Sequence, residues 1–79
     1  MRKFILLMCE ENERVNVKLR FESMGTAEMA KKICIEFSRI TGYKHGGITF
    51  FGKNHNAIYW YKYDNGKFEK GTPKKWGII

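Results

Sequence analysis

Histidine and cysteine side chains are the first candidates for chemistry in this chain, because they ligate metals and serve as bases or nucleophiles. The chain has two of each: Cys9, Cys34, His45 and His55. No Cys-x-x-Cys or Glu-x-x-His spacing joins them into a ligand set, and both histidines lie near Gly and Asn residues that are typical of solvated turns. The cysteines lie within apolar runs, which predicts buried core thiols. We therefore expect no metal and no cofactor.

Carboxylates and nucleophile motifs do not indicate a catalytic site either. Glu10, Glu11 and Glu13 are clustered in one polar stretch, whereas an acid/base pair needs two carboxyl groups in different environments. The sequence contains no G-x-S-x-G motif. Gly46 and Gly47 precede a predicted strand rather than a helix, so they lack the helix N-terminus that binds phosphate. We expect a protein that is not an enzyme.

Basic and aromatic residues are concentrated in the second half of the chain. The 79 residues carry a formal charge of +7, of which residues 1–38 contribute +1 and residues 39–79 contribute +6. The second half also holds most of the aromatic residues, namely Tyr43, Phe50, Phe51, Tyr59, Trp60, Tyr61, Tyr63, Phe68 and Trp76. A basic surface with aromatic rings indicates nucleic acid or an acidic protein surface as the partner.

The elements that must position these residues follow from hydrophobic periodicity. Residues 2–9 predict a strand that is apolar on both faces, and residues 15–21 predict a half-buried strand with strict alternation. A helix capped by Ser23 or Thr26 and ended by Gly42 follows, and then strands over 48–53, 57–63 and 67–70. Asn65–Gly66 predicts a tight hairpin turn. The expected fold class is α+β, a two-layer ββαβββ arrangement in which one amphipathic helix packs on an antiparallel sheet. It forms a single domain over residues 1–79, with a C-terminal tail over residues 71–79.

Period two divides the 57–63 strand into two faces. Ile58 and Trp60 form the more apolar set, which predicts that they face the helix and that Tyr59, Tyr61 and Tyr63 lie on the open side of the sheet. By the same logic Ile48 and Phe50 face inward, and Thr49 faces outward. The candidate binding residues are Lys18, Arg20, Phe51, Lys53, Tyr59, Tyr61, Lys62, Tyr63, Lys67, Lys74 and Lys75.

An open sheet face of this composition has three interpretations. Stacking rings and basic side chains favour single-stranded DNA or RNA, since each stacked base contributes roughly 1–3 kcal/mol. An aromatic face also docks onto proteins, so a nucleic-acid-handling complex or a second copy of the chain is an equal candidate, and the chain is a monomer or a homodimer. Tyrosines on an exposed sheet, with lysines that protect its edges, also stabilise the fold without any ligand.

The N-terminal segment does not have the pattern of a signal peptide. The apolar run from Phe4 to Cys9 is short and leads directly into acidic residues. No segment approaches the roughly 20 apolar residues of a membrane span, and two cysteines form no disulfide framework. We expect a cytoplasmic protein with no membrane partner.

Three segments carry a family resemblance: the MRKFILLM start, SMGTAEMAKKI at the helix and AIYWYKYDNGKFEKG near the end. Over roughly residues 1–70 this layout resembles the anti-CRISPR proteins, compact phage-encoded inhibitors of bacterial defence. The resemblance implies a non-enzymatic phage or mobile-element inhibitor, in the cytoplasm of a bacterial host, that blocks a nucleic-acid-handling complex. Many members are acidic DNA mimics. The +7 charge departs from that pattern and implies acidic protein surface or nucleic acid as the target.

Overall fold

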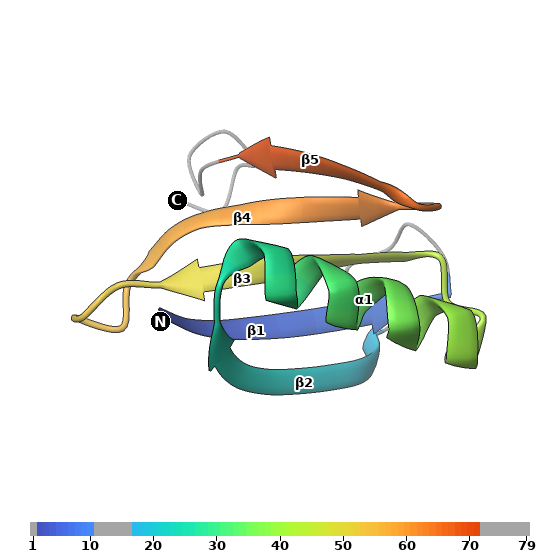
Figure 1. Cartoon of the computed structure of the whole chain (residues 1–79), viewed down its shortest axis with the longest axis horizontal. Helices are drawn as coiled ribbons and strands as arrows, with labels where there is room; N and C mark the ends of the chain where they lie inside the picture. Colours follow the sequence, from blue (N-terminus) through green and yellow to red (C-terminus); the bar gives the residue numbers. More distant parts are fainter. Residues whose placement is uncertain (1, 11–16, 72–79) are drawn as a thin grey trace.

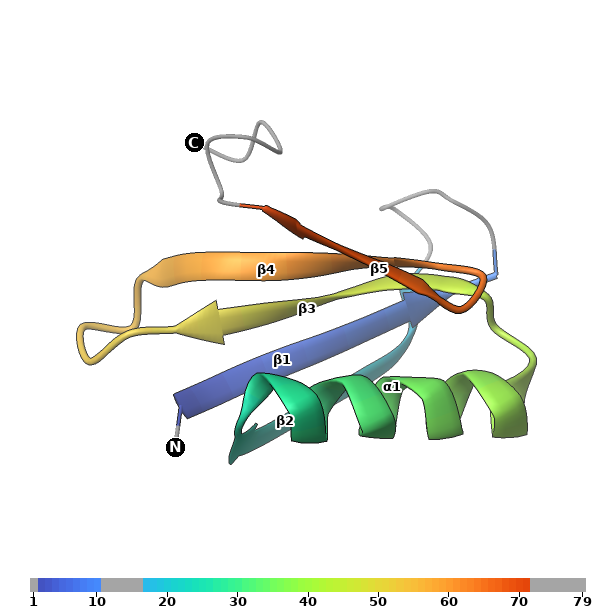
Figure 2. The same cartoon turned by 45° about the horizontal axis from the view of Figure 1, so that its top comes forward.

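The computed structural model describes residues 2–10 and 17–71, which form one helix packed on a five-stranded antiparallel sheet (Figure 1). The elements are β1 (Arg2–Cys9), β2 (Val17–Gly25), α1 (Ala27–Thr41), β3 (His45–Phe51), β4 (Ala57–Asp64) and β5 (Lys67–Gly71). The strand order is β2-β1-β3-β4-β5. Figure 2 shows the helix in a separate layer on one side of the sheet. The predicted ββαβββ order and two-layer α+β class are confirmed.

The core lies between α1 and the central strands. Phe4, Leu6 and Met8 of β1 are fully buried and alternate with side chains on the other face. They meet Ala30 and Cys34 from the helix. Burial of a large apolar side chain contributes about 1.5–3 kcal/mol, so this row is the main reason that the helix stays on this side of the sheet. Ile48 and Phe50 of β3 are also fully buried there, as expected.

Local signals set both ends of α1. Thr26 is the N-cap, and its Oγ1 accepts a hydrogen bond from the Met29 N–H at 3.2 Å. Gly42 ends the helix with a left-handed φ of 81°, and its N–H donates to the carbonyl of Ser38 at 2.9 Å. The sequence prediction left Ser23 and Thr26 as alternative caps, and the structure selects Thr26.

The strand boundaries differ from the sequence prediction chiefly at β2 and β3. β2 continues through Met24 to Gly25, where a break was expected, because these residues pair with the start of β1. β3 begins at His45, within the predicted loop, because Gly46 and Gly47 pair with β1 and β4 at once. Lys53 accordingly lies after β3, in the turn before β4.

The predicted orientation of β4 is wrong. Tyr61 and Tyr63 are buried in the core, with 9% and 4% of their surface exposed, and Tyr59 packs against the same cluster. The reason is a hydrogen-bond chain: the Tyr63 hydroxyl donates to Ser38 Oγ at 2.9 Å, and Ser38 Oγ donates to the Tyr43 carbonyl at 2.6 Å. With their hydroxyls at a polar spot beside the helix, the tyrosines are the better core residues, and Trp60 is placed on the other face.

Candidate functional site: the open face of the sheet

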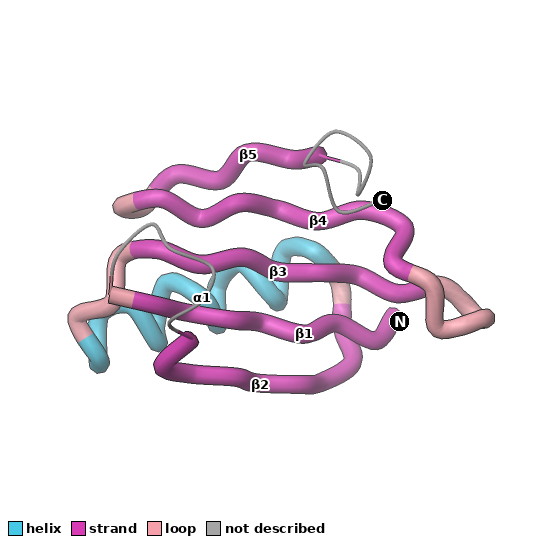
Figure 3. The backbone as a smooth tube through the Cα atoms, turned by 180° about the vertical axis from the view of Figure 1, so that it is seen from behind, coloured by secondary structure: helices cyan, strands magenta, loops and turns pink. Residues whose placement is uncertain are grey.

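The side of the sheet opposite α1 is seen in Figure 3. Strand register places alternate residues there, and we call this surface the open face. Its members include Lys3, Ile5 and Leu7 of β1, Lys18, Arg20, Glu22 and Met24 of β2, Gly47, Thr49 and Phe51 of β3, Trp60, Lys62 and Asp64 of β4, and Lys67 and Glu69 of β5. Within residues 2–10 and 17–71, no helix or second sheet covers it.

The centre of the open face is apolar. Ile5 and Leu7 of β1 are only half-buried, and Thr49 lies between Ile5 and Trp60 in the cross-strand register. A Cβ placed on Gly47 would lie 3.9 Å from Cε3 of Trp60, so the indole ring lies beside the glycine, at van der Waals distance from that position. Aliphatic and indole groups from three strands therefore form an apolar surface at the centre of the open face.

Charged side chains border this centre on the β2 side. Glu22 lies 3.1 Å from Lys3 and 3.6 Å from Arg20, so two cations share one carboxylate. The Lys3 ammonium also lies 5.7 Å from the centre of the Phe51 ring, a cation–π contact that places Phe51 on this face. Lys18 adds a further exposed cation, which leaves this border basic.

The β4–β5 hairpin has a shallow hollow whose lining includes residues of the open face. Its volume is about 290 Å³, and its lining residues are Lys62, Asp64, Lys67, Phe68 and Glu69. In the register Lys62 lies opposite Glu69, and Asp64 lies opposite Lys67. Charges of both signs alternate around this hollow, so it favours neither an anion nor a cation.

The structure brings together only part of the predicted site. Five predicted residues, Lys18, Arg20, Phe51, Lys62 and Lys67, lie on the open face. Lys53 is exposed in the turn beyond β3. The tyrosines of β4 lie on the helix side, and Lys74 and Lys75 fall outside the described residues. Sequence reasoning missed Trp60 as a member of the site. Ile5 and Leu7 were not among the candidate binding residues, although the outward side chains of residues 2–9 were expected to add apolar area to the open face.

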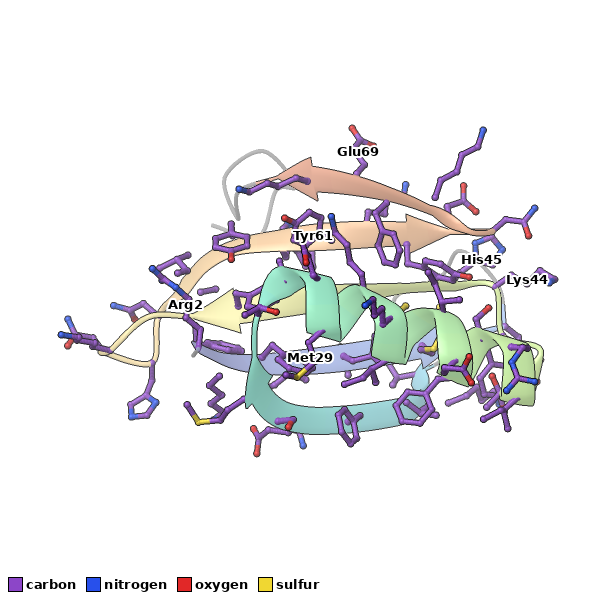
Figure 4. All side chains as sticks on the ribbon, viewed as in Figure 1. Arg2, Met29, Lys44, His45, Tyr61 and Glu69 are labelled. Carbon is purple, nitrogen blue, oxygen red and sulfur yellow. The ribbon has the colours of Figure 1, made fainter. Side chains whose placement is uncertain are left out.

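On the helix side, the tyrosines form an aromatic cluster with Phe68 beside α1. Tyr61 makes edge-to-face contacts with Tyr59 and Phe68, at centroid distances of 6.0 and 6.4 Å. The Lys31 ammonium lies 4.2 Å from the Tyr61 ring centre, and Lys70 lies 4.5 Å from that of Tyr59. Figure 4 shows Tyr61 next to the first turns of the helix. Tyr61 and Tyr63 are buried, so their rings are not available to stack on bases, and Tyr59 and Phe68 are half-buried in the same cluster.

One cross-strand row brings together residue types of a nucleophilic site. Cys9, His45 and Asp64 are register neighbours on β1, β3 and β4. His45 Nδ1 lies 3.0 Å from Asp64 Oδ1, which is within ion-pair distance, but the geometry is not that of a hydrogen bond. The buried Cys9 thiol, however, points to the His45 backbone carbonyl at 3.7 Å. The thiol therefore contacts the backbone of β3, and this row adds a cross-strand contact to the strand pairing.

The other buried thiol is Cys34, and burial raises its pKa to about 12. Within the described ranges, no three His, Cys, Asp or Glu side chains come close enough to hold a metal ion. α1, the helix of the described residues, is too short and too polar to cross a bilayer. Comparison of the chain with protein-family models, with curated proteins and with solved structures gives no match.

Proposed function

We propose that this chain is a non-catalytic binding module that docks onto another protein through the open face of its sheet. The observation that carries the proposal is the composition of that face: an apolar centre of Ile5, Leu7 and Trp60, bordered by Lys3, Lys18 and Arg20. Protein interfaces have this organisation, with a core depleted in charge and a polar rim, and Trp and Arg dominate their binding energy.

The placement of the rings favours a protein over a single-stranded nucleic acid as the partner. A nucleic-acid platform presents aromatic rings to successive bases. The tyrosine row that would have done this is on the helix side. The open face presents one indole, Trp60, and one phenyl ring, Phe51, beside the aliphatic Ile5 and Leu7, so it has no row of rings for successive bases. The basic border then suits acidic side chains at the rim of a protein partner.

The proposal extends to the class of partner. The resemblance to anti-CRISPR proteins implies a complex that handles nucleic acid in a bacterial host, and a basic inhibitor of such a complex would meet acidic protein surface. A charge of +7 draws the module toward acidic surface through long-range attraction. On this proposal the chain is a phage or mobile-element inhibitor that occludes part of such a complex.

A matched pair of variants tests the proposal. Ile5→Lys adds a charge at the apolar centre, next to the Glu22 carboxylate that can pair with it. Ile35→Lys makes the same change on the outer surface of α1, where Ile35 is 46% exposed. Tagged wild type and Ile35→Lys should capture the same bacterial complex from nuclease-treated lysate, identified by mass spectrometry, and Ile5→Lys should lose it. Equal capture by Ile5→Lys contradicts docking through the open face.

Titration of labelled oligonucleotides separates the alternative function. A stand-alone DNA or RNA binder making about five phosphate contacts would show a log–log salt slope of roughly −3.5 to −4.5. We expect no measurable binding of either single or double strands at about 50 mM salt, where non-specific attraction is strong. Binding with that slope would replace the protein-docking proposal with direct nucleic-acid binding.

A further inference from the structure

β2 forms one edge of the sheet and offers a long pairing surface. Along the described residues, β1 is its only strand neighbour, so its outer backbone N–H and C=O groups face away from the sheet (Figure 1). β2 has nine residues, whereas β5 at the opposite edge has five. Natural sheets usually shorten, cover or charge such an edge, because an open edge pairs readily with another strand. The side chains of β2 point to the two faces and leave the edge itself accessible.

The sequence of β2 is complementary to itself in one antiparallel register. When two copies pair around Phe21, Arg20 of each copy lies opposite Glu22 of the other, and all nine residues from Val17 to Gly25 find a partner. Centring the pair on Arg20 or on Glu22 instead places like charges directly opposite, which is destabilising. The register around Phe21 is therefore the one that charge and strand length both favour.

The flank of α1 above β2 is also apolar. The Phe37 ring lies 5.3 Å from that of Phe21, which shows that this flank overlooks β2. Met29, Ile33 and Ile40 share the flank with Phe37 at helical spacing. Met29 is 41% exposed and Ile40 is 69% exposed, and Figure 4 shows Met29 between the helix and β2. A charged helix surface would be expected here if this flank stayed in water.

We propose that a second copy of this chain pairs with the β2 edge, so that two sheets join across a two-fold axis at Phe21. An axis perpendicular to the sheet keeps both helices on one side, where their apolar flanks face each other, and leaves both open faces together on the other side. The dimer explains the exposed Ile40 and the self-complementary charges of β2 with one contact. It goes beyond the proposed docking function and does not depend on it, because it uses the edge rather than the open face.

Sedimentation velocity of the full chain, over a range of concentrations at about 150 mM salt, tests the dimer. The mass should rise with concentration from 9.3 kDa toward that of two chains. Arg20→Glu and Glu22→Arg each place like charges opposite one another twice in the dimer, and each should weaken self-association about tenfold or more. An equimolar mixture of the two variants should associate again, since the acidic pair of one then meets the basic pair of the other.

A second pair of variants tests the helix flank. Ile40→Lys should weaken the dimer about tenfold or more, because it places a charge between the two helices. Ile35→Lys, on the flank that carries Lys31, should dimerise as the wild type does, and far-UV circular dichroism should show that both variants fold. A wild type that stays monomeric at all concentrations overturns the proposal. So does self-association that neither the charge variants nor Ile40→Lys weakens, or charge variants that fail to recover on mixing.

Discussion

Ser38→Ala is expected to lower the free energy of unfolding by about 1–3 kcal/mol, because it removes one buried and one partly buried hydrogen bond, worth roughly 0.5–1.5 kcal/mol each. Ser38 accepts from the Tyr63 hydroxyl at 2.9 Å and donates to the Tyr43 carbonyl at 2.6 Å. Both Ser38 and Tyr63 are buried, so water does not replace the lost partner. A chain of this length has about 4–12 kcal/mol of stability in total. The loss is therefore a substantial fraction.

Urea unfolding followed by circular dichroism measures this change, and a double-mutant cycle with Tyr63→Phe isolates the bond between the two side chains. Tyr63→Phe alone should cost about 0.5–1.5 kcal/mol, and the double variant should cost less than the two single changes together, by a similar amount. Tyr59→Phe is the matched control. Tyr59 is on the same strand and face and stacks on Phe50 at 5.0 Å. Its hydroxyl has no hydrogen bond among the described residues, so its loss should change stability by less than about 0.5 kcal/mol.

The double-mutant cycle also tests which side chains of β4 face the helix and which lie on the open face. If the two changes are additive and Tyr63→Phe is neutral, the hydroxyl does not reach Ser38 and β4 does not face the helix with its tyrosines. Trp60→Phe would then be the costly substitution. The open face would carry the tyrosines in place of Trp60, and the reasoning that favours a protein partner would fail.

Three further predictions concern packing and titration. Gly46→Ala should lower the free energy of unfolding by roughly 1–3 kcal/mol, because the new Cβ would collide with the Leu7 carbonyl oxygen. Gly47→Ala should lower it by less in the same urea assay, since its Cβ would lie 3.3 Å from the nearest atom. Burial raises the pKa of Cys34 from 9.0 to about 12, so its contribution to the free energy of unfolding is complete below pH 9 and falls by about 1.4 kcal/mol per pH unit above pH 9. At pH 8, alkylation of the Cys34 thiol should require global unfolding, so its rate should rise with denaturant. A rate that does not depend on denaturant would contradict this. Arg39 lies 2.8 Å from Glu36 and lowers the pKa of that carboxyl, so the ion pair stabilises the helix above the ordinary Glu pKa and the stabilisation is lost as the pH falls. Arg39→Gln should raise the pKa of Glu36 measured by NMR titration. An unchanged pKa would show that the ion pair does not form.

Elements with local signals could be predicted from the sequence. The strand at Arg2–Cys9 was expected at its observed bounds, and so were the left-handed Gly42 and the turn at Asn65 and Gly66, which both have positive φ. Each of these depends on residues adjacent in sequence: an apolar run, a glycine after a helix, an Asn-Gly pair. Backbone conformational preference is sufficient to determine them.

The start of β3 could not be predicted, because its cause lies elsewhere in the chain. His45, Gly46 and Gly47 carry no strand propensity, and adjacent glycines usually indicate a loop. They are extended because β1 and β4 pair with them from both sides. Gly46 is required for a further reason, the close approach of the β1 backbone at Leu7, which is a contact between distant segments.

The orientation of β4 shows how one such distant contact changes the functional conclusion. By hydrophobicity alone, Ile58 and Trp60 outrank the tyrosines for the core. Tyr63 is nevertheless buried, because Ser38, 25 residues earlier on α1, gives its hydroxyl a partner. Once Tyr63 faces the helix, the pleat places Tyr61 on the same side and Trp60 on the other. The open face thereby exchanges a row of stacking rings for an aliphatic centre with one indole. A buried hydroxyl pair therefore removes the predicted row of stacking rings from the exposed surface, and the proposed docking on a protein rests on that change.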